Sequence, residues 1–313
     1  MTNQSTTITN PIDDARRDIE PPMEAGIAPT GSRLPAATHL GHVSLQVADL
    51  ARSLQYYQRV LGLRVLEQSA NTALLGTLDV NTPLVHLTER RGANHVPLHG
   101  RLGLYHYAIL LPNRAALGRF IVHLAEINER AGASDHFVSE ALYLRDPDGL
   151  GIEVYADRPR RSWVAVNRQL KMATEHLDVD DVIRSADGER WSGMPAGTAM
   201  GHVHLHVGNL SEAADFYHTA LGFDKMVWDY PSALFLAAGG YHHHLGLNTW
   251  AGPNAPRPTE ADARLVEWRI ILPSHADTAR VAEKLAKSGY DIVAADNSWL
   301  ATDPWGTSVR LIT

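Results

Sequence analysis

Cysteine is absent from the 313 residues of the chain, which excludes disulfides, thiolate nucleophiles and cysteine metal ligands. No apolar run approaches the roughly 18 residues that a membrane-spanning helix needs. The N-terminus also lacks the charged and apolar regions of a secretory signal. The sequence has no basic block or stripe, and its net charge is −7, from 28 Lys and Arg against 35 Asp and Glu. These absences predict a cytoplasmic protein that binds neither nucleic acid nor membrane.

The residues that are present describe an ordinary globular chain. Hydrophobic residues make up 44% and charged residues 20% of the sequence, and the length suffices for two domains with real cores. Four segments differ in pattern. Residues 1–37 are polar and aperiodic, which is typical of a disordered or docking arm. Residues 38–156 and 197–313 alternate between strand and helix patterns, and the weakly periodic residues 157–196 form the expected connector.

Each patterned half follows the order strand, helix, three strands, twice over. In the first unit, Asp49 is the expected N-cap of an amphipathic helix that buries Leu54 and Tyr57. In the second, the run LYHYAILLP precedes a helix that Asn113 can cap, and the turn DPDG precedes the strand GIEVYA. The expected fold is therefore α+β, built of β-α-β-β-β modules.

The second half repeats the first. Three motifs recur at offsets near 160 residues. GHVSLQVADL at 41–50 corresponds to GHVHLHVGNL at 201–210. ILLP at 109–112 corresponds to IILP at 270–273, and DPDG at 146–149 corresponds to DPWG at 303–306. A repeat with so few gaps indicates duplication. We expect four modules, paired two by two into an N-terminal and a C-terminal domain.

Two histidines and one carboxylate lie on three strand-like segments of the first half. His42 and His106 are on the first strands of their modules, and Glu153 is on the last strand, within the apolar run GIEVY. An unpaired carboxylate is costly to bury there, and metal ligation would explain it. Two imidazoles and one carboxylate form the facial triad of non-haem iron(II) sites, which leaves coordination positions open.

The paired modules, the histidine on the first strand and the DPDG-x-x-I-E-V ending together resemble the vicinal oxygen chelate superfamily. Within it, the chain resembles the two-domain extradiol ring-cleaving dioxygenases of the bacterial catechol 2,3-dioxygenase branch. The matching stretches are GLYHYAILLP, GASDHFVSEALYLRDPDGLGIEVYADRP, GHVHLHV and YHHHLGLNTWAG. The resemblance covers residues 38–313, and the block at 132–159 is its most specific part.

The resemblance implies roles for five residues. His42, His106 and Glu153 fall on the family's metal-ligand positions, His136 falls on its acid–base histidine, and Tyr143 falls on the tyrosine that hydrogen-bonds the substrate. The implied metal is Fe(II), with Mn(II) as an alternative that the same ligands would hold. A further active-site histidine of the family has no counterpart at the expected spacing, although His95 and His99 lie nearby.

The implied reaction inserts O2 into a catechol ring next to its two hydroxyls and gives a muconic semialdehyde. A small catecholic substrate, O2 as co-substrate and a role in aromatic catabolism follow from the same resemblance, as does a homo-oligomeric state. A metal that binds both reactants would remove much of the entropy cost of bringing them together. A neighbouring histidine would act first as base and then as acid.

The corresponding positions in the C-terminal half have lost this ligand pattern. Glu267 takes the place of His106, and Arg310 takes the place of Glu153, so we expect these two side chains to pair where a metal would otherwise bind. A second metal site made of His202, His244 and Glu267 is the less favoured alternative.

Two other functions remain open from the sequence. A metal-dependent glyoxalase-like isomerase or lyase of this superfamily would use four protein ligands, with Glu89 as the added carboxylate. A planar-ligand binding or resistance protein of the same fold would need no metal. The histidine pair, Glu153, His136 and Tyr143 favour the dioxygenase.

Overall fold

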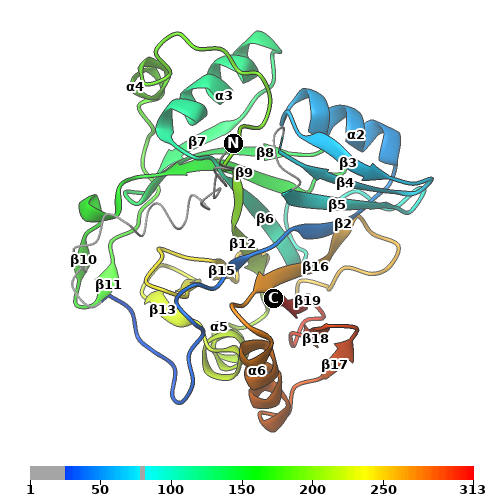
Figure 1. The fold of residues 1–313 in the computed structure, drawn as a ribbon, viewed down its shortest axis with the longest axis vertical. Helices are drawn as coiled ribbons and strands as arrows, with labels where there is room; N and C mark the ends of the chain where they lie inside the picture. The colour runs from blue at the N-terminus through cyan, green and yellow to red at the C-terminus, as the bar shows by residue number, and fades with distance from the viewer. Residues whose placement is uncertain (1–24, 78–81) are drawn as a thin grey trace, which may run out of the picture.

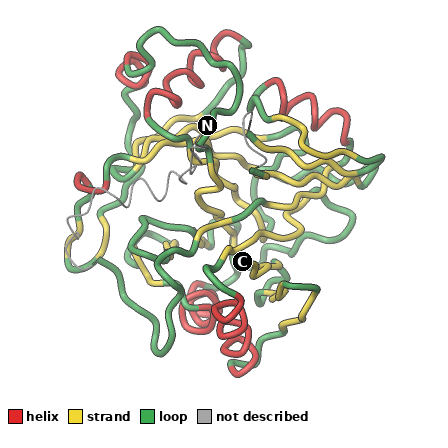
Figure 2. Tube along the Cα trace, in the orientation of Figure 1, coloured by secondary structure: helices red, strands yellow, loops and turns green. Residues whose placement is uncertain are grey.

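The computed structural model describes residues 25–77 and 82–313, and the expectation for residues 1–24 lies outside this range. Its strands form two large curved sheets and a short two-stranded ribbon (Figure 1). The four expected β-α-β-β-β modules are confirmed, and so is the α+β class. Helices cover the outer faces of the sheets at opposite ends of the molecule, as the red segments of Figure 2 show.

The nine-stranded sheet combines the first and fourth modules, in the order β17-β18-β19-β16-β2-β5-β4-β3, with β1 paired to β16. Its strands are β1 (His39–Leu40), β2 (Val43–Val47), β3 (Arg64–Gln68), β4 (Thr72–Gly76), β5 (Pro83–Glu89), β16 (Arg264–Ile271), β17 (Ile292–Ala295), β18 (Ser298–Thr302) and β19 (Ser308–Ile312).

The eight-stranded sheet combines the second and third modules, in the order β13-β14-β15-β12-β6-β9-β8-β7. Its strands are β6 (Gly103–Leu110), β7 (Gly132–Asp135), β8 (Ser139–Arg145), β9 (Gly151–Asp157), β12 (Ala199–His206), β13 (Asp224–Val227), β14 (Ala233–Ala237) and β15 (Leu245–Asn248).

Each module also carries a helix, and the connector adds short elements. The module helices are α2 (Leu50–Arg59), α3 (Arg114–Glu126), α5 (Leu210–Ala214) with the π-helical η2 (Asp215–Leu221), and α6 (His275–Lys287). The connector holds η1 (Arg160–Ser162), β10 (Ala165–Val166), β11 (Gln169–Leu170) and α4 (Val179–Arg184). Within the described part of the chain, no helix combines the length and the apolar character needed to cross a membrane.

The expected pairing of modules within each half is not the one observed. Strand β6 of the first half pairs antiparallel with β12 of the second, and β2 pairs antiparallel with β16. Both sheets are therefore shared between the halves. Sequence periodicity marks which residues belong to a strand, but it does not mark which strand becomes the neighbour.

Side-chain caps fix the helix starts where the sequence predicts them. The Asp49 side chain accepts the Arg52 backbone N–H at 3.0 Å, and the Asn113 side chain accepts that of Ala116 at 2.9 Å. These bonds satisfy backbone donors that a first helical turn leaves without partners. The two cap predictions are confirmed.

Buried tyrosine–aspartate bonds connect the modules of each half. The Tyr57 hydroxyl donates to Asp146 at 3.1 Å, and in the second half the Tyr217 hydroxyl donates to Asp303 at 2.9 Å. Burial raises the pKa of Asp146 to about 7. Each aspartate also accepts backbone N–H bonds from its own DPxG turn, so the turn and the preceding module helix are held together.

The hydrophobic core draws on all four modules. Leu45, Tyr107, Leu205 and Trp268, one from each module, are buried in one continuous cluster. Fully burying such side chains contributes roughly 1.5–3 kcal/mol each, so neither half keeps its share of the core alone.

The shared sheets predict that the halves do not fold separately. A chain ending at residue 196 and a chain starting at residue 197 should each lack a cooperative thermal transition, because β6 and β12 would become open edges and the core would be exposed. Circular dichroism melting of each half, and of the two refolded together, measures this. A cooperative transition in either isolated half would contradict the interdependence of the two halves.

Candidate metal centre

The side chains of His106, Glu153 and His202 converge where β12, β6 and β9 of the eight-stranded sheet run side by side. His202 lies opposite Ala108, and Ala108 lies opposite Glu153. His202, Ala108 and Glu153 therefore form one row across the strands. His106 shares the face of Ala108 because side chains two apart on a strand point the same way. Ala108 has no side chain beyond its Cβ atom, which leaves room for the larger neighbours to meet.

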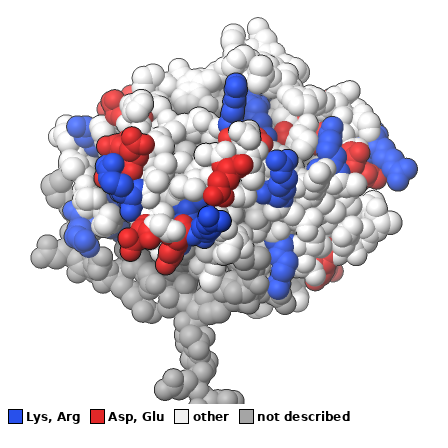
Figure 3. All heavy atoms as spheres, turned by 90° about the horizontal axis from the view of Figure 1, so that it is seen from above, with Lys and Arg blue, Asp and Glu red and all other residues white. Residues whose placement is uncertain are grey.

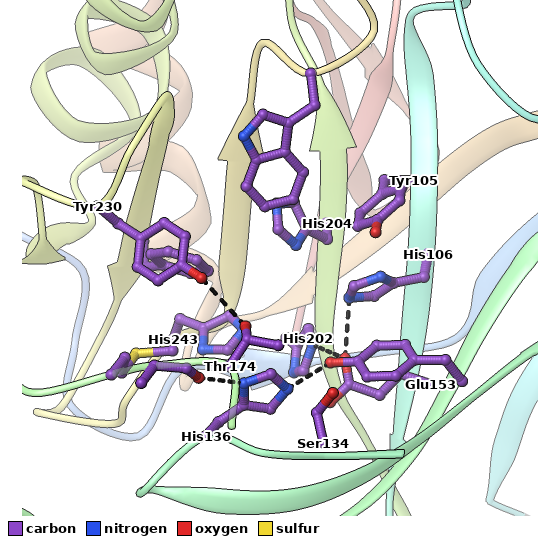
Figure 4. Close-up of a pocket in the computed structure, with 15 residues that line it drawn as sticks. Tyr105, His106, Ser134, His136, Glu153, Thr174, His202, His204, Tyr230 and His243 are labelled. Carbon is purple, nitrogen blue, oxygen red and sulfur yellow. Dashed lines mark hydrogen bonds and ion pairs between the residues drawn. The ribbon is translucent and has the colours of Figure 1, made fainter. Parts of the chain in front are cut away.

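The ligand atoms of His106, Glu153 and His202 all lie within 4.8 Å of one another (Figure 4). Glu153 Oε2 is 3.0 Å from His106 Nε2 and 3.1 Å from His202 Nε2. The exposed fractions of the three residues are 5%, 2% and 1% in chain order. No other group of three potential ligands this close was found among the described residues.

Burial controls the charges of this cluster. It lowers the pKa of both His106 and His202, against the opposing effect of Glu153, so both rings are neutral at neutral pH. Burial alone would raise the pKa of Glu153, but the two neighbouring imidazoles hold it well below its ordinary value. Two neutral nitrogens and one anionic oxygen are thus directed at one point.

This donor set fits a divalent transition metal. His106 Nε2 is fully buried and has no hydrogen-bond partner, although Glu153 Oε2 is only 3.0 Å away. A buried polar atom without a hydrogen bond is costly, and coordination would satisfy it. Two imidazoles and one carboxylate are the set that binds Fe(II), and they leave part of the coordination sphere open.

The structure separates His42 from His106 and Glu153, so the expected trio is corrected in its first member. His42 lies next to the nine-stranded sheet, where its ring is 6.2 Å from that of His86 and lines a different cavity. Burial and Arg269 lower the pKa of His42 to about 4. His42 is separated from His106 because modules pair across the halves. This pairing places the first strand of the third module beside His106, and not the first strand of the first module.

The sequence did contain a signal for His202. It occupies the place of His42 in the repeat, since GHVHLHV at 201–207 aligns with GHVSLQV at 41–47. His106 and Glu153 do come together as the sequence analysis expects. The alternative site of His202, His244 and Glu267 is not assembled, because Glu267 lies in the other sheet.

His136 and Tyr143 lie at the edge of the same cluster. The Ala173 carbonyl oxygen can only accept, so His136 Nδ1 donates to it at 2.6 Å. The Tyr143 hydroxyl lies 2.6 Å from His136 Nε2. Burial and nearby Glu153 raise the pKa of Tyr143 well above its ordinary value, and its hydroxyl remains a donor. Tyr143 pairs with Glu153 across β8 and β9.

A second group of histidines, for which the sequence predicts no ligand role, borders the cluster. His204 Nε2 accepts a hydrogen bond from the buried Asn248 side chain at 2.9 Å. His243 Nδ1 contacts His242 Nδ1 at 2.7 Å, and His242 Nε2 in turn contacts the Asp157 carboxylate at 2.8 Å. These bonds fix the orientation of His204 and His243, both of which line the pocket in front of the metal centre.

This pocket has a volume of about 220 Å³ and receives residues from both halves and from the connector. Its lining residues are Tyr105, His106, Ser134, His136, Tyr143, Glu153, Met172, Ala173, Thr174, His202, His204, Tyr230, Phe235, His243 and Trp250. The cluster of His106, Glu153 and His202 therefore lies at the wall of a cavity large enough for a small aromatic molecule.

The equivalent position in the nine-stranded sheet holds an ion pair. Arg310 donates from Nη2 to Glu267 at 2.6 Å and from Nε at 2.9 Å, which confirms the expected pairing. Glu89 is also engaged elsewhere, since its carboxylate accepts the Leu50 backbone N–H at the start of α2. The four-ligand isomerase site that would recruit Glu89 is thus not formed around His106.

His95 and His99 do not reach the cluster. His95 Nδ1 contacts the Val96 carbonyl at 2.7 Å, and His99 lines a separate small cavity.

On the face seen in Figure 3, Lys and Arg side chains are interspersed with Asp and Glu, and no patch of one sign dominates. This surface offers nothing that would attract a polyanion.

Comparison with known proteins agrees with this geometry. A family model described as "Glyoxalase/Bleomycin resistance protein/Dioxygenase superfamily" matches residues 39–154 and again 199–308. A "Catechol-2,3-dioxygenase" of Bacillus subtilis (strain 168) is 45% identical over 271 residues, which cover 85% of this chain and 94% of the relative. A "Lactoylglutathione lyase" of Escherichia coli O157:H7 is 26% identical over 125 residues, 37% of this chain and 91% of the relative.

Solved structures share the fold. A putative dioxygenase of Bacillus subtilis subsp. subtilis str. 168 has a TM-score of 0.64 at 14% identity, covering 90% of this chain and 86% of that one. Glyoxalase I of Zea mays has a TM-score of 0.52 at 18% identity, covering 88% and 92%. The chain belongs to the glyoxalase/bleomycin resistance protein/dioxygenase superfamily and, within it, to the family of the bacterial catechol-2,3-dioxygenase.

Proposed function

We propose that this protein is an Fe(II)-dependent extradiol dioxygenase that inserts O2 into a catechol ring next to its two hydroxyls and releases a muconic semialdehyde. One observation carries the proposal, which is the buried cluster of two neutral imidazoles and one carboxylate at the wall of a 220 Å³ pocket. The 45% identity to a catechol-2,3-dioxygenase, spread over nearly the whole relative, supports the same chemistry.

His106, His202 and Glu153 are the proposed ligands, and His42 is not one of them. An ion held by this set would supply activation of O2 beside a chelated catechol, through coordination positions that the protein leaves open. The same donors would also hold Mn(II), but a given set of nitrogen and oxygen ligands binds Fe(II) more tightly than Mn(II), so Fe(II) is the proposed metal. Burial of all three ligands keeps bulk water from the ligand atoms.

His136 and Tyr143 are the proposed proton-handling pair. His136 Nδ1–H is anchored on the Ala173 carbonyl, so its Nε2 presents a lone pair to the pocket side, where Tyr143 now donates. A catechol hydroxyl could replace Tyr143 as the donor and give up its proton to Nε2. His136 would return that proton as the ring opens, which is general base and then general acid catalysis.

Oxygen uptake tests the proposed function. Protein loaded anaerobically with Fe(II) and mixed with catechol should consume one O2 per catechol and form a yellow product. Denatured protein with the same iron is the control for oxidation in solution. Bound iron without uptake on any diol would exclude the dioxygenase function.

Metal retention distinguishes the observed cluster from the one that the sequence suggested. Changing His202, His106 or Glu153 to Ala should each abolish retention of Fe(II) through gel filtration, because two remaining ligands bind too weakly. His42→Ala is the matched control and should retain about one iron per chain, since His42 lines a different cavity. Iron content by atomic emission measures both. Iron lost in His42→Ala and kept in His202→Ala would reverse the assignment.

The proton role of His136 predicts an effect on turnover without an effect on metal. His136→Ala should lower kcat by roughly 10²-fold or more, the usual contribution of a positioned acid–base group. Iron content should stay unchanged, because His136 supplies none of the three ligand atoms. The comparison variant is His99→Ala, which removes a histidine from the neighbouring cavity. Equal kcat for both variants and the parent would remove His136 from the mechanism.

A further inference from the structure

We propose that a cavity at the junction of the two sheets binds a small doubly charged oxyanion, either phosphate or a short dicarboxylate. The guanidinium groups of Arg101, Arg257 and Arg264, which all line this cavity, are its ligands. None of the three residues lines the pocket of the candidate metal centre, so the site stands apart from the proposed function.

The cavity lies where β6 of one sheet passes β16 of the other (Figure 1). Arg101 precedes β6 in the first half of the chain, and Arg264 begins β16 in the second half. Arg257 lies in the loop that leads to β16. Cations from both halves therefore meet at one place, and an ion bound between them would contact both halves.

Arg101 is a buried cation with little compensation. Its side chain is 11% exposed, its Nη2 donates to the Ala263 carbonyl at 2.6 Å, and its Nη1 is 3.8 Å from the Asp262 carboxylate. The distance to Asp262 is too long for a hydrogen bond, and this carboxylate already accepts from Thr259 and Asn94. A carbonyl satisfies one donor but does not neutralise a charge, so an anion in the cavity would offset the cost of burying this guanidinium.

Arg264 and Arg257 have donors to offer to such an anion. Arg264 Nε is fully buried and has no hydrogen-bond partner, which is costly for a polar atom. Arg257 Nη2 donates to the Pro304 carbonyl at 2.6 Å, and this bond fixes the guanidinium at the cavity wall. An arginine carries five N–H donors in a planar fork, so one such bond leaves most of them for a ligand.

The nearby carboxylates are turned to other partners. Asp303, on which Arg257 acts electrostatically, accepts the Tyr217 hydroxyl at 2.9 Å and two backbone N–H groups of its own turn. No Asp or Glu is among the described residues that line the cavity. Arg114 shows the contrast, since it forms a 2.6 Å ion pair with Glu140. The wall of the cavity thus presents three cations and no anion.

The volume of the cavity limits the size of the ion. It measures about 100 Å³, and its other walls include the apolar side chains of Leu104, Leu265 and Trp305. A cavity of about 150 Å³ holds a benzene ring, so this one admits an ion of a few heavy atoms but no nucleotide. Guanidinium forks match the paired oxygens of phosphate and carboxylate groups, which favours an oxyanion over a halide.

Titration of the full-length protein with inorganic phosphate and with malonate tests the site. By calorimetry, at least one of the two should bind with a Kd below about 10 mM, and the tighter probe identifies the source of the anion. The Tm should rise by about 2 °C at ten times this Kd, because the ion binds the folded chain. Sodium chloride at equal ionic strength is the control for screening. No saturable binding of either probe below about 10 mM would overturn the proposal, and so would equal rises in Tm with all three salts.

Charge-matched variants locate the anion. Arg257→Gln and Arg264→Gln should each raise the Kd of the tighter probe by about tenfold, because each removes charge-assisted hydrogen bonds. Arg257 is exposed, so its replacement should leave the fold intact, and thermal melting checks this. Arg184→Gln, on α4 with a side chain that is 66% exposed, makes the same change in net charge and should leave the Kd unchanged. Equal Kd values in the three variants would overturn the proposal.

A further variant separates this site from the candidate metal centre, where an anion could bind to iron. Glu153→Ala removes one of the proposed metal ligands and should keep the affinity of the parent protein for the probe. Loss of binding in this variant would place the anion at the metal centre and overturn the proposal. Binding that persists in Glu153→Ala would support the arginine site even if no diol is cleaved.

Discussion

The antiparallel pairing of β6 with β12 is the interaction on which the rest of the structure depends. It joins the two halves of the chain into one sheet and sets the register in which His202 faces Ala108, with Glu153 on the next strand. A shift of one residue in this register would turn His202 to the opposite face of the sheet and dismantle the cluster. The site is therefore a product of strand pairing, and no single module contains it.

Local structure could be predicted from the sequence because its determinants are local. Alternating apolar residues, the caps Asp49 and Asn113 and the DPDG turn at 146–149 act within a few residues of one another. Module pairing could not be predicted in the same way. First strands of different modules, such as GHVSLQV and GHVHLHV, carry the same pattern, so nothing in their periodicity says which of them lies beside His106. Because of that ambiguity, the sequence prediction named His42 where the structure places His202.

Glu153 shows why the incomplete sequence prediction still pointed to a metal site. A carboxylate buried within an apolar strand needs partners that offset its lost hydration, whichever part of the chain supplies them. This need can be seen in the sequence without knowing the fold. The structure provides the compensation through imidazole nitrogens from both halves, at 3.0 and 3.1 Å. The residue type and its apolar context pointed to a metal, whereas the identity of the second histidine depended on topology.

The two sheets then differ in one respect that decides their chemistry. Each sheet buries a glutamate in its version of the duplicated site, but at different places in the repeat. Glu267 takes the place of His106 and is paired with the permanently charged guanidinium of Arg310, while Glu153 is paired with neutral imidazoles. An arginine cannot give up its charge to accommodate a cation, so the Glu267 site is closed to metals. Imidazole keeps a lone pair for coordination. Duplication thus supplied two related sites. In one, the guanidinium forms an ion pair with glutamate, and in the other, imidazoles keep the lone pairs that the proposed metal would need.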